Sequence, residues 1–161
     1  MRDGEDGAQW VTSHPVAHVV GGRGEAFDDA WDGVEAVIRL DAAQFSEEAL
    51  HGLDAFSHLK VVFHFDRVPV DEVETGARHP RGNEDWPLVG IFAQRGRNRP
   101  NRLGVSRCRL HRVDGLDLRV SGLDAVAGTP VLDIKPYMTE FGPRGELRQP
   151  DWATEIMREY Y

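Results

Sequence analysis

The chain has 161 residues, a formal net charge of −8 at pH 7 and a hydrophobic content of 40%. This length favours one domain with one core, and no apolar run approaches the roughly 20 residues that a membrane span needs. Cys108 is the only cysteine, which excludes an internal disulfide and disfavours a zinc site. We therefore expect a protein of a reducing, cytoplasmic setting, without a metal and without a membrane partner.

The beginning of the chain predicts little ordered structure. Residues 1–13 are mostly polar, begin with an acidic segment unlike a signal or transit peptide, and are expected to be disordered. A single domain is expected over residues 14–161. Its first candidate strand runs from Pro15 to Val20 and is broken by Gly21–Gly24. These glycines are not a phosphate-binding loop, because no Lys-Ser/Thr pair follows them.

An acidic loop follows from Glu25 to Asp32. It carries two aromatic residues, Phe27 and Trp31, among several aspartates. Two interpretations stand side by side. The aromatic residues either form part of a lid over a binding site, or they pin the loop to the core.

Alternation of apolar and polar residues predicts a half-buried strand from Val34 to Leu40. A short helix is expected at Ser46–Leu50, with Ser46 as its N-cap and two glutamates in its first turn. Gly52 ends that helix. The sequence thus predicts one half-buried strand and one short helix in this part of the chain.

The segment His58–Arg67 predicts a strand with two different faces. One face is entirely apolar, whereas the other carries charged and histidine side chains from His58 to Asp66. Because the apolar face belongs to the core, the polar face is expected to line a pocket or a subunit interface. The long loop at 66–87 contains several prolines and glycines, and such loops are usually functional or mobile.

Seven arginines lie between Arg95 and Arg112, and no acidic residue occurs between Asp85 and Asp114. The stretch predicts a strand at Leu88–Phe92, a loop rich in arginine, and a second strand from Gly104 to Arg112. Guanidinium groups on a fixed loop match the geometry of carboxylates and phosphates. The alternative is an ordinary surface loop in a chain that uses arginine instead of lysine.

The rest of the chain predicts more strands. A two-residue hairpin turn is expected at Asp114-Gly115, with strands at Leu116–Ser121 and Val131–Lys135 around the turn-rich connector Gly122–Pro130. Many short strands joined by turns favour a mainly β fold, an antiparallel barrel or sandwich with short helices.

A helix is expected near the C-terminal end of the sequence. Asp151 is expected to cap it, and it should run from Trp152 to about Tyr160. Trp152, Ile156 and Tyr160 recur at helical spacing and form an apolar stripe. That stripe predicts a helix packed on the rest of the domain.

Four segments together resemble the TsaA-like (TrmO-type) family of methyltransferases. They are Gly52–Leu59, Gly90–Arg95 continuing through Arg99-Pro100-Asn101 to Gly104, Gly122–Asp124, and Gly128–Tyr137. The resemblance implies an antiparallel β-barrel with short helices, a homodimer, S-adenosyl-L-methionine as cofactor, and N6-methylation of threonylcarbamoyladenosine in tRNA.

The sequence departs from the family pattern in several places. Gln94, Gly96, Arg97 and Arg102 replace residues of the family's usual arginine–proline loop, and Asp66-Arg67 stands where the family has His-Gln. The acidic Phe27–Asp32 loop takes the place of the family's proline-rich cofactor loop. We therefore expect a short, divergent member without the small C-terminal domain of many bacterial members.

The resemblance and the side-chain chemistry together give a set of expected cofactor contacts. Arg95 would bind a carboxylate or backbone carbonyls, whereas Asp66 and Asp124 would face an ammonium, ribose hydroxyls or the sulfonium. The adenine would lie against leucine side chains and nearby backbone. The expected cofactor-binding set is Asp66, Arg67, Arg95, Leu103, Val105, Gly122, Leu123 and Asp124. For Asp124 the alternative is a cap of the turn at 122–128.

A second set concerns catalysis and the methyl acceptor. Methyl transfer is an in-line displacement, so orientation supplies most of the acceleration. A base is needed only if the acceptor must lose a proton, and the candidates are His64, Asp66 and Tyr137. The expected acceptor-binding residues are Arg97, Arg99, Asn101, Arg102 and Lys135.

For several of these residues, a purely structural role is the alternative to a role in the site. For Lys135 the alternative is a structural ion pair with Asp133. His58 is expected to be a structural histidine, and Cys108 to be buried and inert. At the level of function, a methyltransferase acting on an anionic small molecule and a non-catalytic nucleotide- or RNA-binding barrel remain alternatives to tRNA methylation.

Overall fold

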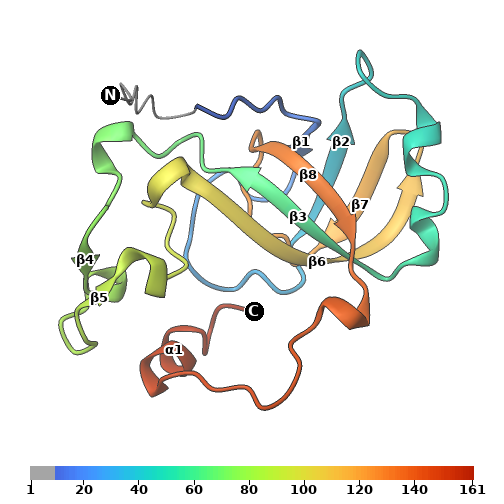
Figure 1. Ribbon diagram of the computed structural model, residues 1–161. Coiled ribbons are helices and arrows are strands. Elements are labelled where there is room, and N and C mark those ends of the chain that lie inside the picture. The colour runs from blue at the N-terminus through green and yellow to red at the C-terminus, as the bar shows by residue number, and fades with distance from the viewer. Residues whose placement is uncertain (1–9) are drawn as a thin grey trace, which may run out of the picture.

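The structure is a computed structural model that describes residues 10–161. Its centre is a closed antiparallel barrel of six strands in the order β1-β2-β7-β6-β3-β8 (Figure 1). The strands are β1 (Ala17–Val20), β2 (Glu35–Leu40), β3 (His58–His64), β6 (Leu103–Asp114), β7 (Asp117–Ser121) and β8 (Pro130–Pro136). The predicted mainly β barrel with short helices, among them a C-terminal one, is confirmed.

The barrel core follows from the alternation of side chains along each strand. In β3, Leu59, Val61 and Phe63 are buried, while the residues between them are half-buried. Ile38 of β2 and Leu118 of β7 are likewise fully buried and join the same core cluster. Successive side chains of a strand point to opposite faces, so an alternating sequence gives a barrel with an apolar interior.

Two further strands lie outside the barrel. β4 (Ala77–Arg78) pairs with β5 (Val89–Gly90) as a small antiparallel sheet. The predicted strand at Leu88–Phe92 is therefore wrong in length, because the chain enters a 3₁₀ helix directly after Gly90. The described 3₁₀ helices are Glu47–Leu50, Leu53–Ala55, Val70–Glu72, Pro80–Gly82, Ile91–Ala93, Pro100–Arg102 and Thr139–Phe141.

Local details correct two of the expected ends. The β6–β7 turn is Gly115-Leu116, one residue later than predicted, because Asp114 pairs with Asp117. Gly115 has φ of 61°, the positive value that a tight hairpin requires at its first turn position. Ser46 stands at the N-cap position of the first 3₁₀ helix, but its side chain makes no capping hydrogen bond.

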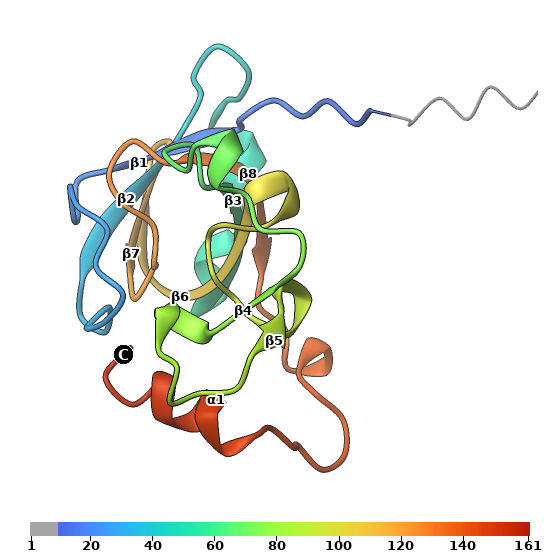
Figure 2. The ribbon, with the colours of Figure 1, turned by 90° about the vertical axis from the view of Figure 1, so that its left-hand side faces the viewer.

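The chain after β8 runs back beneath the barrel to helix α1 (Asp151–Ile156) (Figure 2). Helix α1 is shorter than predicted, and Pro150 rather than Asp151 occupies its N-cap. Residues 143–161, called the tail below, end next to the acidic loop, where the amides of Ala30 and Trp31 donate to the carbonyls of Glu159 and Tyr160. The tail thus closes over one end of the barrel. Residues 1–9, part of the segment expected to be disordered, lie outside the described residues.

Candidate functional site

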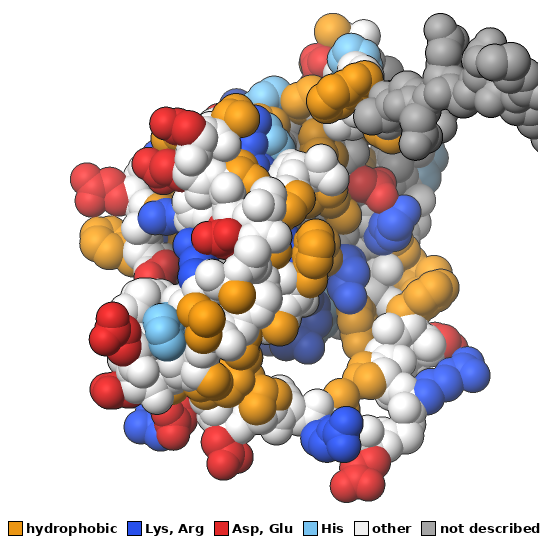
Figure 3. All heavy atoms as spheres, turned by 60° about the vertical axis from the view of Figure 1, so that its left-hand side comes forward, with side chains coloured by type: hydrophobic (Ala, Val, Ile, Leu, Met, Phe, Trp, Pro, Cys, Tyr) orange, Lys and Arg blue, Asp and Glu red, His pale blue; other side chains and the backbone are white. Residues whose placement is uncertain are grey.

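A groove of about 1290 Å³ opens at the end of the barrel that the tail covers. Its walls come from the acidic loop, the end of β3, the loop at 66–87 and the tail. The arginine-rich loop at 94–102, called the arginine loop below, forms a further wall. The space-filling view shows a hollow on this face with basic side chains inside it (Figure 3). Segments far apart in the sequence therefore meet around one cavity.

Many of the residues predicted for the site line this groove. They are Asp66, Arg67, Arg95, Arg97, Arg99, Leu103, Val105 and Asp124. The groove also has an apolar wall, which includes Phe65, Phe92 and Trp152. It therefore offers carboxylates, guanidinium groups and apolar surface within one cavity.

Other predicted residues lie elsewhere. Leu123 is 1% exposed and packs in the barrel core, and the backbone of Gly122 beside it is buried. Asn101 and Arg102 sit at the far end of the arginine loop, with φ of 62° and 50°. Neither these four residues nor His64, Tyr137 and Lys135 line the groove.

The arginine loop is held in place by its own guanidinium groups. Arg95 donates to the carbonyl of Val105 at 2.7 Å, Arg99 to that of Gln94 at 2.8 Å, and Arg102 to that of Val68 at 2.6 Å. The buried side-chain amide of Gln94 donates to two backbone carbonyls of the β4–β5 segment. Because each arginine has further donors in its fork, a bond to the backbone orients the group and leaves N–H groups for a ligand.

The side chains of Arg67 and Asp66 differ in whether they already have hydrogen-bond partners. Arg67 bridges two loops, since it donates to the carbonyls of Gly24 at 2.7 Å and Ala127 at 2.8 Å. Asp66 is exposed at the rim of the groove, directly after β3. Arg67 thus holds the groove wall together, whereas the carboxylate of Asp66 is available to a ligand.

Asp124 occupies the deep part of the groove. One carboxylate oxygen, Oδ2, accepts a hydrogen bond from the hydroxyl of Tyr160 in the tail. The other, Oδ1, is buried and has no partner among the described residues. Within residues 10–161 no hydrogen bond joins the Asp124 carboxylate to the backbone of the connector at 122–128, so the turn-cap alternative is not what the structure shows.

The tyrosine that meets Asp124 stays protonated. Burial, followed by the charge of Asp124, raises the pKa of Tyr160 far above its usual range. The neutral phenol donates a hydrogen bond to the carboxylate, and both residues line the groove. The orphan oxygen of Asp124 is therefore an acceptor for a donor on a bound molecule.

His64 lies on the half-buried polar face of β3. Burial, and then the positive charge of Arg102, lower its pKa, while Asp66 opposes that shift. The imidazole is thus favoured in its neutral form, which suits a base. Its side chain nevertheless does not line the groove.

The two aromatic residues of the acidic loop lie in different settings. Trp31 is 4% exposed, and the guanidinium of Arg23 lies 4.3 Å from its ring centroid. Phe27 is 61% exposed at the edge of the groove. Asp29 of this loop pairs with Arg81 of the loop at 66–87, with contacts of 2.7 and 3.0 Å. Trp31 therefore anchors the loop to the domain, whereas Phe27 is an exposed part of the groove lining.

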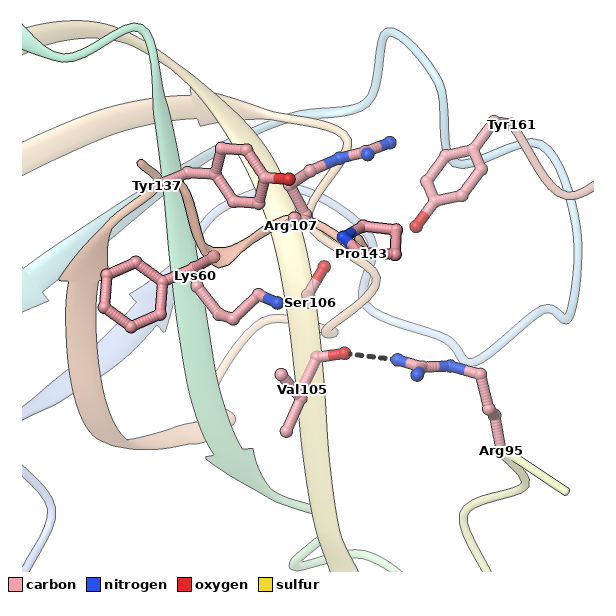
Figure 4. Close-up of a pocket in the computed structure, with 10 residues that line it drawn as sticks. Lys60, Arg95, Val105, Ser106, Arg107, Tyr137, Pro143 and Tyr161 are labelled. Atoms are coloured by element: carbon pink, nitrogen blue, oxygen red, sulfur yellow. Dashed lines mark hydrogen bonds between the residues drawn. The ribbon is translucent and has the colours of Figure 1, made fainter. Parts of the chain in front are cut away.

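Tyr137 and Lys135 lie on the outer wall of the barrel. Lys135 forms an ion pair of 2.7 Å with Asp133, as its structural interpretation predicts. Tyr137 lines a second pocket of about 290 Å³ that adjoins the groove and shares Arg95, Val105 and Tyr161 with it (Figure 4). The two residues assigned from the Gly128–Tyr137 segment therefore belong to a different surface from the groove.

The sequence did not predict the contribution of the tail. Trp152, Ile156, Met157, Tyr160 and Tyr161 all line the groove. The apolar stripe of the helix indicated that this segment packs on the domain, but not which cavity it covers. The indole of Trp86 fixes the helix further by donating to Glu155 at 2.8 Å.

Two kinds of feature are absent from residues 10–161. No group of three or more His, Cys, Asp or Glu side chains is arranged to hold a metal ion. No helix there is long and apolar enough to cross a membrane. Cys108 is buried as predicted, and burial raises the pKa of its thiol to about 12, so it is inert at neutral pH.

The fold is therefore a closed antiparallel barrel with a polar groove at the end that the tail covers. The family model of the tRNA-methyltransferase O N-terminal domain matches residues 28–142. The chain belongs to this family, as its sequence motifs indicated. The match ends before the tail, so the residues that close the groove lie outside it.

Individual relatives agree with this assignment. The chain is 36% identical over 117 residues to the human tRNA (adenine(37)-N6)-methyltransferase, a match that covers 71% of this chain and 26% of that protein. It is 41% identical over 93 residues to the putative S-adenosylmethionine-dependent methyltransferase RcsF of Pseudomonas aeruginosa, covering 56% of this chain and 38% of the relative.

A solved structure shares the fold. A crystal structure of TrmO from Pseudomonas aeruginosa superposes with a TM-score of 0.73 and 27% sequence identity, over 91% of this chain and 63% of that one. The chain thus spans less than two thirds of the length of each of these three proteins.

Proposed function

We propose that the chain is a methyltransferase that uses S-adenosyl-L-methionine and methylates N6 of threonylcarbamoyladenosine in tRNA. The observation that carries this proposal is the groove in which Asp66, Arg95 and Asp124 converge, in a chain of the tRNA-methyltransferase O family. The names of the human and Pseudomonas relatives support the reaction and the cofactor.

The groove fits the chemistry of the cofactor. The buried, unpartnered Oδ1 of Asp124 offers an acceptor to an ammonium or a ribose hydroxyl. Arg95 keeps guanidinium N–H groups for a carboxylate after its bond to Val105. Leu103, Val105 and Phe65 provide apolar surface for an adenine ring. When bound, S-adenosyl-L-methionine supplies an activated methyl group.

The chain's own residues orient the reactants and exclude water. The tail and Phe27 cover the groove, and the arginine loop fixes Arg95 and Arg99 in direction through backbone carbonyls. Of the three candidate bases, Asp66 lines the groove itself, so we assign it the proton that the acceptor nitrogen loses. His64 and Tyr137 lie outside the lining and are assigned supporting positions.

The acceptor is assigned to the rim of the groove. Arg97 lines it, and the structure gives its side chain no hydrogen bond or ion pair within residues 10–161. Such a cation is free to meet a phosphate or another anion. A methyltransferase for an anionic small molecule is the second candidate, favoured by the net charge of −8, which repels RNA.

Assembly and location follow from the family rather than from the groove. We propose a homodimer in the cytoplasm. Exposed apolar side chains support a further contact surface, since Phe92, Phe141 and Leu147 are 77%, 79% and 76% exposed. Sedimentation velocity tests the dimer, and a monomer at micromolar concentration would remove it.

Two measurements, made one after the other, test the function. Isothermal titration with S-adenosyl-L-methionine comes first, and no binding at millimolar cofactor would favour the non-catalytic barrel. A methylation assay with bulk tRNA that lacks the N6-methyl mark comes second. Transfer to tRNA supports the proposal, whereas normal cofactor binding without transfer at high enzyme concentration moves the assignment to a small-molecule acceptor.

A further inference from the structure

The second pocket, on the outer wall of the barrel, has an unusual charge. Three cationic side chains line it, Lys60 from β3, Arg107 from β6 and Arg95 from the arginine loop, and no acidic residue does. Figure 4 shows Lys60 and Arg107 on neighbouring strands and the hydroxyl of Tyr161 pointing toward Arg95. The chain as a whole is acidic, so this local excess of positive charge stands out.

The strand register places Lys60 directly opposite two other basic residues. Lys60 lies opposite Arg107 on β6 and opposite Lys135 on β8. Like charges at directly opposed positions of a sheet are destabilising. Only Lys135 has an acidic partner, Asp133; no ion pair is formed by Lys60 or Arg107 within residues 10–161. The fold thus keeps an unfavourable pair of cations next to an open pocket.

Two exposed arginines elsewhere in the chain have acidic partners. Arg39 makes a two-bond contact with Asp117, and Arg112 pairs with Asp114. The cations of the pocket instead share its lining with two tyrosines, Tyr137 and Tyr161. The ammonium of Lys60 lies 5.7 Å from the ring centroid of Tyr137. Burial raises the pKa of Tyr161, so its hydroxyl remains a donor at neutral pH.

We propose that the pocket formed by Lys60, Arg95, Arg107, Tyr137 and Tyr161 binds a phosphate group of the methyl acceptor, a backbone phosphate of RNA. This proposal rests on the proposed function for the identity of the acceptor. A pocket of about 290 Å³ has room for one phosphate. The phosphate brings the negative charge that the opposed cations lack, and the phenol hydroxyls donate to its oxygens.

The position of the pocket gives it a role in the reaction. It shares Arg95, Val105 and Tyr161 with the groove, so a phosphate bound there lies beside the place where the cofactor and the acceptor base meet. Fixing a phosphate at this point sets the distance and direction of the nucleotide whose base enters the groove. Orientation of this kind is the main contribution that an enzyme makes to a displacement reaction.

The test uses Lys60→Met and Arg107→Met, singly and together, since neither residue is assigned to the cofactor site. Binding of a synthetic anticodon stem-loop RNA is measured by fluorescence anisotropy over a range of salt concentrations. Each neutralised phosphate contributes about 0.7–0.9 to the slope of log Kobs against log salt. Because the two cations share one phosphate, the double variant is expected to lower the slope by about 0.7–0.9 in total.

The control is Arg119→Met, which removes an exposed arginine from β7, away from the pocket. Its slope should equal that of the parent. A fall of about twice the expected amount in the double variant would show two separate contacts and overturn the one-phosphate pocket. Folding is not at issue, since removing one of two opposed cations should leave the thermal midpoint at or above that of the parent.

A second arm identifies the source of the phosphate. Adenosine 5′-phosphate is titrated calorimetrically into the parent and the double variant. Loss of this binding with an unchanged RNA slope keeps the phosphate site and assigns it to a small molecule. Unchanged behaviour in both arms overturns the site. Cofactor affinity is measured in parallel, so failure of the methyltransferase proposal is seen independently of the phosphate pocket.

Discussion

The hydroxyl of Tyr160 donates a hydrogen bond to the Asp124 carboxylate across the covered mouth of the barrel. This contact joins the tail to the connector between β7 and β8, through two residues that are 36 positions apart in the sequence. It leaves the other oxygen of Asp124 buried at the groove, without a hydrogen-bond partner among residues 10–161. The tail therefore contributes directly to the electrostatics of the proposed cofactor site.

Replacing Tyr160 by phenylalanine should lower the free energy of unfolding by about 1–3 kcal/mol, the usual cost of leaving a buried acceptor unsatisfied. The ring and its packing against Tyr161 are retained, so the loss reports on the hydroxyl. Urea denaturation measures it. Tyr161→Phe is the matched control, and equal losses in the two variants would show that the contact with Asp124 adds nothing to stability.

Arg95→Ala should weaken the binding of S-adenosyl-L-methionine by about 1.5–3 kcal/mol, because a charge-assisted hydrogen bond to the cofactor is lost. Isothermal titration gives this value directly. The structural bond from Arg95 to Val105 is lost at the same time, so the melting temperature must be checked in the same variant.

Arg97→Ala provides the comparison for Arg95. Arg97 lines the same groove, but its side chain makes no hydrogen bond to the backbone within residues 10–161, and we assign it to the acceptor. Its removal should leave the cofactor affinity unchanged and raise the KM of the acceptor. If the two variants lose equal cofactor affinity, the division between cofactor and acceptor residues is wrong.

Gly104→Ala should destabilise the protein by about 1–3 kcal/mol through overpacking. A Cβ atom at this position would lie 2.9 Å from Cζ of Phe65 and closer still to two ring carbons of Phe63. Both rings line the groove, and they pack edge to face with centroids 5.2 Å apart. Their displacement should reduce cofactor affinity as well as stability.

The control for Gly104 is Gly90→Ala, because an added Cβ at Gly90 has no neighbour within 4 Å and the backbone φ is negative. Thermal denaturation and titration of both variants separate local crowding from a general effect of losing glycine. A Gly104→Ala protein as stable as Gly90→Ala would show that the two phenylalanine rings move aside without cost.

The barrel could be predicted from the sequence because its strands alternate strongly. The apolar face of His58–Arg67 and the arginine-rich strand after Gly104 became β3 and β6, which pair along their length. Alternation fixes which face is buried, but not where a strand stops. The predicted strand at Leu88–Phe92 ends at Gly90, since β5 has only the two residues of β4 to pair with.

Residues of the candidate site could be predicted only where a local sequence pattern points to them. Asp66, Arg95 and Asp124 were found from their place in motifs, and they converge on the groove. The covering tail could not be found in this way. Its position depends on contacts between Tyr160, Asp124 and the amide of Trp31, which are distant in sequence and leave no local pattern.

Lowering the pH should reduce the free energy of unfolding through His64. Burial and then Arg102 lower the pKa of this imidazole, so the folded state favours its neutral form relative to the unfolded chain, where histidine titrates near 6.5. The stabilisation is present above about pH 6.5 and is lost as the pH falls through the lower pKa of the folded state. His64 is partly open to solvent, so the effect should be about a few tenths of a kcal/mol.

His64→Gln should remove this dependence. The difference in free energy of unfolding between the parent and the variant, measured by urea denaturation from pH 7.5 to pH 5, should shift against the parent as the pH falls. His51→Gln, at an exposed histidine between the first two 3₁₀ helices, is the matched control variant. Parallel curves for His64→Gln and the parent would show that His64 titrates alike in the folded and unfolded chains, and would remove the neutral imidazole on which its candidacy as a base depends.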